Sequence, residues 1–249
     1  MAAGLYLAGT SPVHRLPAHT KIVGALLGVL AVVATPREVL WAFGAHLIVL
    51  VAVWRAAHIP ARWFATRALI ELPFVVLVVL LPFAGHGERV PVLGVSLSVA
   101  GLYAAWNILA KGTLGVLVSL TLAGSTPLRD LVAGLQRLRA PAIVTTIATL
   151  MLRYLDVIAA EAARMRLARI SRGHDPRLLT QVGATARGVG TLFIRSYERG
   201  ERVHLAMLAR GWTGTMPADA PPAGRAEWAA ALVPAATMIA ITALAWWAR

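Results

Sequence analysis

Five long apolar runs are the feature of this sequence that most constrains its fold. A helix needs about 20 apolar residues to cross the ~30 Å hydrocarbon layer of a bilayer, and the longer runs approach that length. Only 14% of the 249 residues are charged and 58% are hydrophobic, which leaves too little polar surface for a soluble domain. We therefore predict an all-α polytopic membrane protein with about five transmembrane helices. The runs are Ile22–Thr35, Val39–Trp54, Leu69–Gly85, Ser98–Gly124 and Trp228–Trp247.

The basic residues predict how these runs are oriented. The chain carries 24 Lys and Arg against 11 Asp and Glu, and in membrane proteins the cationic excess lies in cytoplasmic loops. This rule places the N-terminal segment and the 55–67 loop in the cytoplasm, and the 36–38 turn and the 86–97 loop outside. The predicted domains are a membrane domain of four spans at 1–124, a cytoplasmic helical region at 125–227 and a C-terminal transmembrane helix at 228–249.

The composition argues against several classes of function. The chain has no cysteine, so it has neither disulfides nor thiolate metal ligands. Its cations lie between apolar runs rather than on a soluble basic scaffold, which argues against nucleic-acid binding. It lacks the G-x-x-x-x-G-K-[ST] loop, so it cannot hydrolyse ATP by the P-loop route. Cations precede the first apolar run, and no short apolar region with a cleavage site comes before them, so no cleaved signal peptide is expected.

The region between the fourth and fifth runs is expected to be helical. Pro127 and Pro141 bracket a short amphipathic helix that suits the membrane surface or a partner. A long helix is predicted from about Pro141 to Arg172, and a second over about 185–210. The uncharged run 141–152 is too short to span a bilayer, so we interpret it as the buried or re-entrant start of the first long helix.

Each long helix carries a stripe at 4-3 spacing, which is typical of a seam packed against another helix. The same spacing continues to Arg169 and Arg172 on the first helix and to Arg210 on the second. The acidic residues lie among arginines, as ion pairs along a helix face would. The stripes are Met151, Leu155, Ile158, Ala162 and Met165, then Val189, Phe193, Ser196, Gly200, Val203 and Met207; the acidic residues are Asp156, Glu161, Glu198 and Glu201.

Both helices end in a small residue, an arginine and a glycine. One interpretation is an ordinary helix stop, with glycine at the C-terminal end and arginine complementing the helix dipole. The other is docking, in which a narrow helix end enters a groove and the guanidinium binds a carboxylate of a partner. The candidate docking residues are Ser171, Arg172 and Gly173, and Ala209, Arg210 and Gly211.

These triplets lie in RMRLARISRGHDPR at 164–177 and LFIRSYERGERVHLAMLARGWTG at 192–214. Together with SPVHRLPAHTK at 11–21, SVAGLYAAWNILAKGTLGVL at 98–117 and MLRYLDVI at 151–158, they make the chain resemble a known family. It is the transmembrane T component of energy-coupling factor (ECF) transporters, in its cobalt-type form, CbiQ. The chain departs from the family pattern at 17–19, where Pro-Ala-His replaces the Asp-Pro-Arg that often precedes the lysine.

The resemblance implies a non-enzymatic, multi-pass subunit of the inner (plasma) membrane. In this family the T component links an integral membrane substrate-binding subunit to two cytoplasmic ATPase subunits through two long crossed helices. Each helix ends in a small-Arg-small motif that docks in one ATPase, and Arg172 and Arg210 match the motif arginines. The resemblance also implies cobalt as the substrate, with nickel or a vitamin as alternatives, and no cofactor on this chain.

The sequence contains several other polar residues and glycines that are candidates for functional or contact sites. The seven histidines are scattered, with no H-x-x-x-H pair on a predicted helix, so we expect surface or interfacial histidines and no metal site. Glu71 and Lys111 are intramembrane ionisable residues. Either they are functional, or Glu71 lies at the level of the headgroups and Lys111 pairs with it or extends its ammonium to the membrane surface. Gly101, Gly112 and Gly115 are expected to allow close helix contacts.

Two other classes of membrane protein fit less well. A membrane-embedded enzyme needs paired carboxylates, a metal triad or a Ser-His set near the membrane, and only Glu71 lies in a predicted span as an acid. A secondary transporter usually has inverted repeats, and we find no internal repeat.

Overall fold

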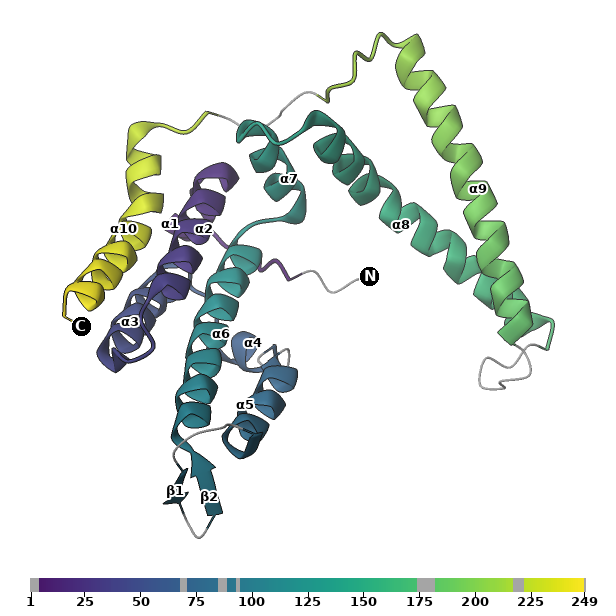
Figure 1. Cartoon of the computed structure of the whole chain (residues 1–249). Helices are drawn as coiled ribbons and strands as arrows, with labels where there is room; N and C mark the ends of the chain where they lie inside the picture. The colour runs from purple at the N-terminus through teal and green to yellow at the C-terminus, as the bar shows by residue number, and fades with distance from the viewer. Residues whose placement is uncertain are drawn as a thin grey trace. The chain divides into compact units, whose positions relative to one another are not determined.

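The computed structural model describes residues 5–67, 71–84, 89–92, 95–173, 182–216 and 222–248. The chain divides into two compact units, which we describe separately. The membrane unit comprises residues 2–134 and 220–249, and the long-helix unit comprises residues 135–219. Figure 1 labels the elements in chain order.

Each apolar run that was predicted to span the membrane forms a helix in the membrane unit. Two of these helices, α6 and α10, are long and apolar enough to cross a bilayer, and α2, α3 and α5 are shorter apolar helices. The helical fold of a polytopic membrane protein is therefore confirmed. Short helices α1 and α4 were not predicted. The bounds are α1 Pro12–Arg15, α2 Ala18–Ala34, α3 Leu40–Ala56, α4 Ala61–Ala65, α5 Leu72–Ala84, α6 Val99–Ser125 and α10 Arg225–Trp247.

A short hairpin forms where the sequence predicted only a loop. β1 (Arg89–Val92) pairs antiparallel with β2 (Val95–Ser98), which leads directly into α6. The VSLS sequence of β2 alternates apolar and polar residues, which is a strand signal. The 86–97 connection therefore contains a hairpin that was not predicted. The side chain of Ser98 caps α6 by accepting a hydrogen bond from Gly101 N at 3.3 Å.

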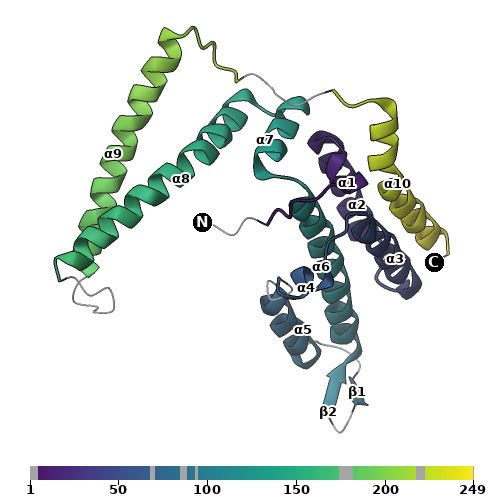
Figure 2. The ribbon, with the colours of Figure 1, turned by 180° about the vertical axis from the view of Figure 1, so that it is seen from behind.

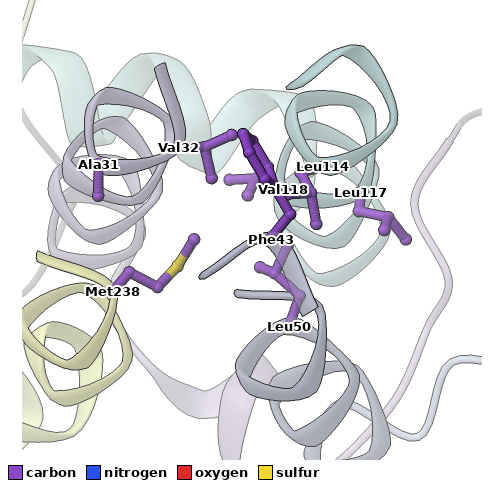
Figure 3. Close-up of a cluster of buried hydrophobic side chains, with 8 residues drawn as sticks. All are labelled: Ala31, Val32, Phe43, Leu50, Leu114, Leu117, Val118 and Met238. Carbon is purple, nitrogen blue, oxygen red and sulfur yellow. The ribbon is translucent and has the colours of Figure 1, made fainter. Parts of the chain in front are cut away.

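Four helices meet in the main apolar core of the membrane unit (Figure 3). Met238 of α10 and Val32 of α2 are almost fully buried there, against α3 and α6. The remaining members of this core are Ala31, Phe43, Leu50, Leu114, Leu117 and Val118.

Helices α2 and α10 approach so closely that α2 needs glycine at the contact. A Cβ built on Gly24 would lie 2.7 Å from the carbonyl oxygen of Ala231, and one on Gly28 would touch Met238 at 3.4 Å. Gly24 and Gly28 form a G-x-x-x-G pattern, which lets helix backbones pack closely in membranes. The sequence analysis did not single out these two glycines.

A buried polar cluster joins α2, α3 and α10. Thr35 Oγ1 lies 3.0 Å from His46 Nε2, and Thr242 Oγ1 donates a hydrogen bond to the carbonyl oxygen of Ala31 at 3.0 Å. His46 has no exposed surface and His19 is also buried, so the expectation that the histidines are surface or interfacial residues was wrong for these two. Both were misjudged because a sequence does not show which face of an apolar helix is packed against other helices.

The two intramembrane ionisable residues do not pair with each other. Thr113 donates a hydrogen bond to Glu71 Oε2 at 3.0 Å, and Lys111 Nζ donates to the carbonyl oxygen of Val33 at 2.7 Å. Of the two alternatives for Lys111, pairing with Glu71 is therefore not the one that the described residues form.

The three glycines named from the sequence behave differently. Gly101 makes the predicted close contact, because a Cβ there would lie 2.6 Å from the Leu81 carbonyl oxygen of α5. Gly112 and Gly115 face open space, with no atom of the described residues within 4 Å of a built Cβ, so they make no close helix contact inside this chain.

The two predicted long helices form the long-helix unit. They are α8 (Ala142–Ser171) and α9 (Val182–Ala209), and Figures 1 and 2 show them together near the C-terminal end of α8 and diverging from there. By length and composition α8 also qualifies as a membrane-crossing helix. The interpretation of residues 141–152 as a buried or re-entrant helix start rested on the uncharged run alone, whereas the apolar part of α8 extends past Arg153.

The short amphipathic helix α7 (Leu128–Arg137) precedes α8. Its residues Val132 and Gly134 are buried, and a Cβ built on Gly134 would lie 2.9 Å from the backbone nitrogen of His19 in α2. This face of α7 therefore packs against the start of α2 rather than against a separate partner.

Candidate functional site

Helix α9 ends in a complete C-terminal cap in which a glycine adopts the left-handed conformation. Gly211 has a φ of +79°, in the left-handed region that glycine adopts without strain. Its N–H donates to the Leu208 carbonyl at 2.9 Å, and Trp212 N–H donates to the Met207 carbonyl at 3.0 Å. These two bonds define a Schellman motif and place Arg210 as the last residue before the turn.

The end of α8 has the same construction. Gly173 also has a φ of +79°, and its N–H donates to the Ile170 carbonyl at 3.0 Å. Arg172 is the C-cap residue, and its N–H donates to the Arg169 carbonyl at 3.0 Å. The chain that follows, including His174, lies outside the described residues. The two triplets predicted from the sequence therefore place their arginines at equivalent helix positions.

All six candidate docking residues are exposed. Ser171 Oγ donates to the Leu167 carbonyl of its own helix at 3.1 Å, which satisfies the hydroxyl without an outside partner. Within the described ranges, neither the Arg172 nor the Arg210 guanidinium forms a hydrogen bond or ion pair. Among the described residues, both guanidinium groups are therefore exposed and unpaired.

An ordinary helix stop explains why glycines follow α8 and α9, but it does not explain why an arginine precedes each glycine. Helix α7 ends with the same hydrogen bonds, Arg139 N to the Gln136 carbonyl and Ala140 N to the Leu135 carbonyl, and its left-handed residue is Arg139 itself. A cation in the last turn interacts favourably with the helix dipole, by about 0.3–1 kcal/mol at an exposed site. That effect needs no small residue beforehand and no particular position for the cation. The repeated position of Arg172 and Arg210 is the feature that the dipole leaves unexplained.

The two arginines lie at opposite ends of α9. Arg172 comes just before the connection to the N-terminal end of α9, and Arg210 follows its C-terminal end. Since α9 has 28 residues and a helix rises 1.5 Å per residue, the helix separates its two ends by about 42 Å. A helix of this length between the two caps suits two separate binding surfaces.

An ion-pair cluster joins the two helices where they cross. The buried Glu161 of α8 accepts hydrogen bonds from Arg199 at 2.8 Å and from Arg195 at 3.2 Å, both on α9. These bonds, with Arg199 contributing most, hold the pKa of the Glu161 carboxyl below its ordinary value. Glu161 follows Arg153 and Asp156 and is followed by Arg164 and Arg166, so this carboxylate lies in the charged C-terminal part of α8 and not in its apolar N-terminal part.

The sequence analysis misassigned the pairing of Glu161. It expected ion pairs along one helix face, which Glu198 and Arg202 do form, weakly, at 3.9 Å. Glu161 instead pairs across to the other helix. The signal was present, because Arg195 and Arg199 are four residues apart on α9 and can bind one carboxylate together.

The predicted seam of α9 was also partly wrong. Ser196, Val203 and Met207 are half-buried as expected, but Val189 is 61% exposed and Phe193 is 71% exposed. Gly188 takes part in the crossing instead, because Arg169 of α8 lies over it where a Cβ would collide. On α8, Ile158, Ala162 and Met165 are half-buried, whereas Met151 and Leu155 are exposed.

Replacing Glu161 with Gln should loosen the crossing without unfolding either helix. The change leaves two guanidinium groups without their shared carboxylate, so the angle between α8 and α9 should become more variable. Because the chain has no native cysteine, spin labels at Ile147→Cys and Leu205→Cys can report this as a broader distance distribution. Glu198→Gln is the matched control and should leave the distribution unchanged; equal distributions for Glu161→Gln and the parent chain would contradict the assigned role.

The described residues contain no group of three or more His, Asp or Glu placed to hold a metal ion. The arrangement that the structure does offer is two exposed cations on rigid helix ends, joined through an ion-paired crossing.

This chain is similar to known proteins over most of its length. A profile of the family CbiQ, described as cobalt transport protein, matches residues 9–220. The cobalt transport protein CbiQ of Rhodobacter capsulatus is 31% identical over 204 residues, which cover 82% of this chain and 81% of the relative. The energy-coupling factor transporter transmembrane protein EcfT of Bacillus selenitireducens is 25% identical over 238 residues, covering 85% and 83%. A Methanocorpusculum labreanum protein that carries the name of a fused cobalt transport protein, CbiMQ, is 26% identical over 83% of this chain and 36% of its own length.

Proposed function

Because this chain belongs to the CbiQ family of cobalt transport proteins, we propose that it couples ATPase motion to a substrate-binding membrane subunit in an ECF-type importer. The chain is the membrane T component, and the ATP is hydrolysed by partner subunits. The observation that carries this proposal is the matched pair of exposed arginines, Arg172 and Arg210, at equivalent C-terminal caps of α8 and α9.

The geometry suggests how force would pass through the long helices. Each guanidinium binds a carboxylate in a groove of one cytoplasmic ATPase subunit, since arginine presents a planar fork that matches a carboxylate. The glycine that follows leaves the helix end narrow. Closure of the ATPases then moves the ends of α8 and α9, and the Glu161 cluster keeps the two helices joined as they move.

Cobalt is the proposed substrate, and a separate integral membrane subunit is proposed to bind it. The relative named CbiMQ supports such a partner, because its name describes a fused cobalt transport protein and the part that matches this chain is only 36% of its length. Nickel or a vitamin would be carried by the same coupling mechanism with a different substrate-binding subunit. We place the protein in the inner membrane with the long-helix unit in the cytoplasm.

Co-purification tests the proposal directly. When the tagged chain is expressed with the ATPase and substrate-binding genes of its host, both kinds of subunit should be recovered with it. The chain alone should show no ATP turnover, whereas the assembled complex should. Recovery of the chain without any ATPase, or ATP turnover by the chain alone, would contradict the coupling role. Uptake of radioactive cobalt, nickel and labelled vitamins by the complex then identifies the substrate.

A further inference from the structure

An open cavity of about 380 Å³ lies inside the membrane unit, between α1, α2, α3, α6 and α10. Its walls are mostly apolar, and α2 and α10 contribute small residues there, such as Gly24, Gly28 and Ala235. The small side chains on these two helices leave space that larger residues would fill. Apolar cavities of this kind hold hydrocarbon rather than water, because a water molecule would find too few polar partners.

One charged residue, Lys21, is part of the described wall of this cavity. Lys21 is 9% exposed, and its Nζ donates a hydrogen bond to the carbonyl oxygen of Ser125 at 3.0 Å. An ammonium group has three N–H donors, so two remain. Asp130 lies near enough to attract the ammonium, but no carboxylate of the described residues is within ion-pair distance of it. A buried cation without a paired anion is costly, which favours an anionic ligand at this point.

The surroundings of the cavity are cationic as well. The wall residues Leu16 and Ala56 are each preceded by an exposed arginine, Arg15 and Arg55. Neither arginine forms an ion pair among the described residues. The acidic Glu227, three residues before the wall residue Ala230, is already used to cap α10 through Gly224 N at 2.7 Å.

We propose that this cavity binds an anionic phospholipid, with an acyl chain between α2, α3, α6 and α10 and its phosphate at Lys21. The apolar walls account for the acyl chain. The buried ammonium, with two N–H donors that no described residue accepts from, accounts for the charged headgroup. A zwitterionic lipid fits the apolar walls equally well. Its headgroup, however, places its own cation beside the Lys21 ammonium, and the two like charges repel each other. This site is separate from the arginine caps, and its test requires no ATPase.

Native mass spectrometry of the full chain tests the charge of the ligand. The purified protein is titrated with dioleoyl phosphatidylglycerol and, in parallel, with dioleoyl phosphatidylcholine. The anionic lipid should bind at least fivefold more tightly. Lys21→Gln should abolish that preference, whereas Lys111→Gln, which removes a lysine outside the cavity, should preserve it. Equal binding of the two lipids by the parent chain, or a preference unaffected by Lys21→Gln, would overturn the proposal.

A second set of variants tests the acyl chain. Val53→Trp places a large ring in the cavity wall and should weaken binding of both lipids at least tenfold, while Val76→Trp on the exposed face of α5 should not. Thr121→Leu is a smaller change in the same wall and should also weaken binding of both lipids. This variant provides the test if Val53→Trp fails to fold. Lipid that stays bound in both wall variants, or lipid that millimolar inorganic phosphate displaces completely, would show that the cavity does not hold an acyl chain.

Discussion

Replacing Arg172 and Arg210 together with alanine should abolish cobalt uptake by the assembled transporter while the chain still inserts and folds. Both side chains are exposed and have no partner among the described residues, so truncation removes no hydrogen bond or ion pair within that part of the chain. Truncating a guanidinium at the centre of a desolvated interface lowers the binding free energy by about 2–4 kcal/mol. Each change should therefore weaken binding of one ATPase by about 30- to 1,000-fold. Uptake of radioactive cobalt and recovery of the ATPases on a tag measure the two effects.

Matched arginines on the same helices provide the controls. Arg164 on α8 and Arg202 on α9 are also exposed, and their alanine variants should transport normally. Arg210→Lys keeps the charge but loses the planar fork, so it should retain part of the activity. Normal uptake by the Arg172→Ala, Arg210→Ala double variant would disprove docking through these residues, and the helix-stop interpretation would then be sufficient.

The helices of this fold were predictable because the signals for them are local. Prolines and charged residues interrupt the apolar runs, and the predicted ends of α3, α6 and α8 lie within two residues of the observed ones. The caps at Gly173 and Gly211 were predictable for the same reason, since a glycine after a helical pattern indicates a left-handed turn. The hairpin before α6 was missed only because the alternation in its sequence was not considered.

Contacts between helices were predicted less well, because each depends on which faces meet. The phase of the α9 seam was chosen from one helix alone, and Arg169 over Gly188 shows that the true contact lies one residue away from Val189. His46 lies in an apolar run that gives no sign of Thr35 and Thr242 on two other helices. The partners of Glu161 are 34 and 38 residues away, beyond the range of any helical pattern.

The second large effect is expected at Gly24, where the packing of the membrane unit is tightest. In Gly24→Val the Cβ would lie 2.7 Å from the Ala231 carbonyl oxygen, a backbone atom that cannot rotate away, so α2 and α10 must separate. Separation opens the apolar core around Met238 and strains the cluster of Thr35, His46 and Thr242 that joins these helices. Overpacking alone costs about 1–3 kcal/mol, and the lost contacts add to it. We expect a large drop in the unfolding temperature in detergent and a low yield of folded protein.

Alanine variants of two glycines separate this packing effect from helix propensity. Gly44, on α3, has no atom of the described residues within 4 Å of a built Cβ, so Gly44→Ala should be neutral or should stabilise its helix by up to about 1 kcal/mol. Gly24→Ala carries the same gain in helix propensity but collides with Ala231, and should lower the unfolding temperature. Equal unfolding temperatures for these two variants would mean that α2 and α10 are not in close backbone contact. The core that surrounds the lipid cavity would then need a different arrangement, because Gly24 and Ala231 both form its wall.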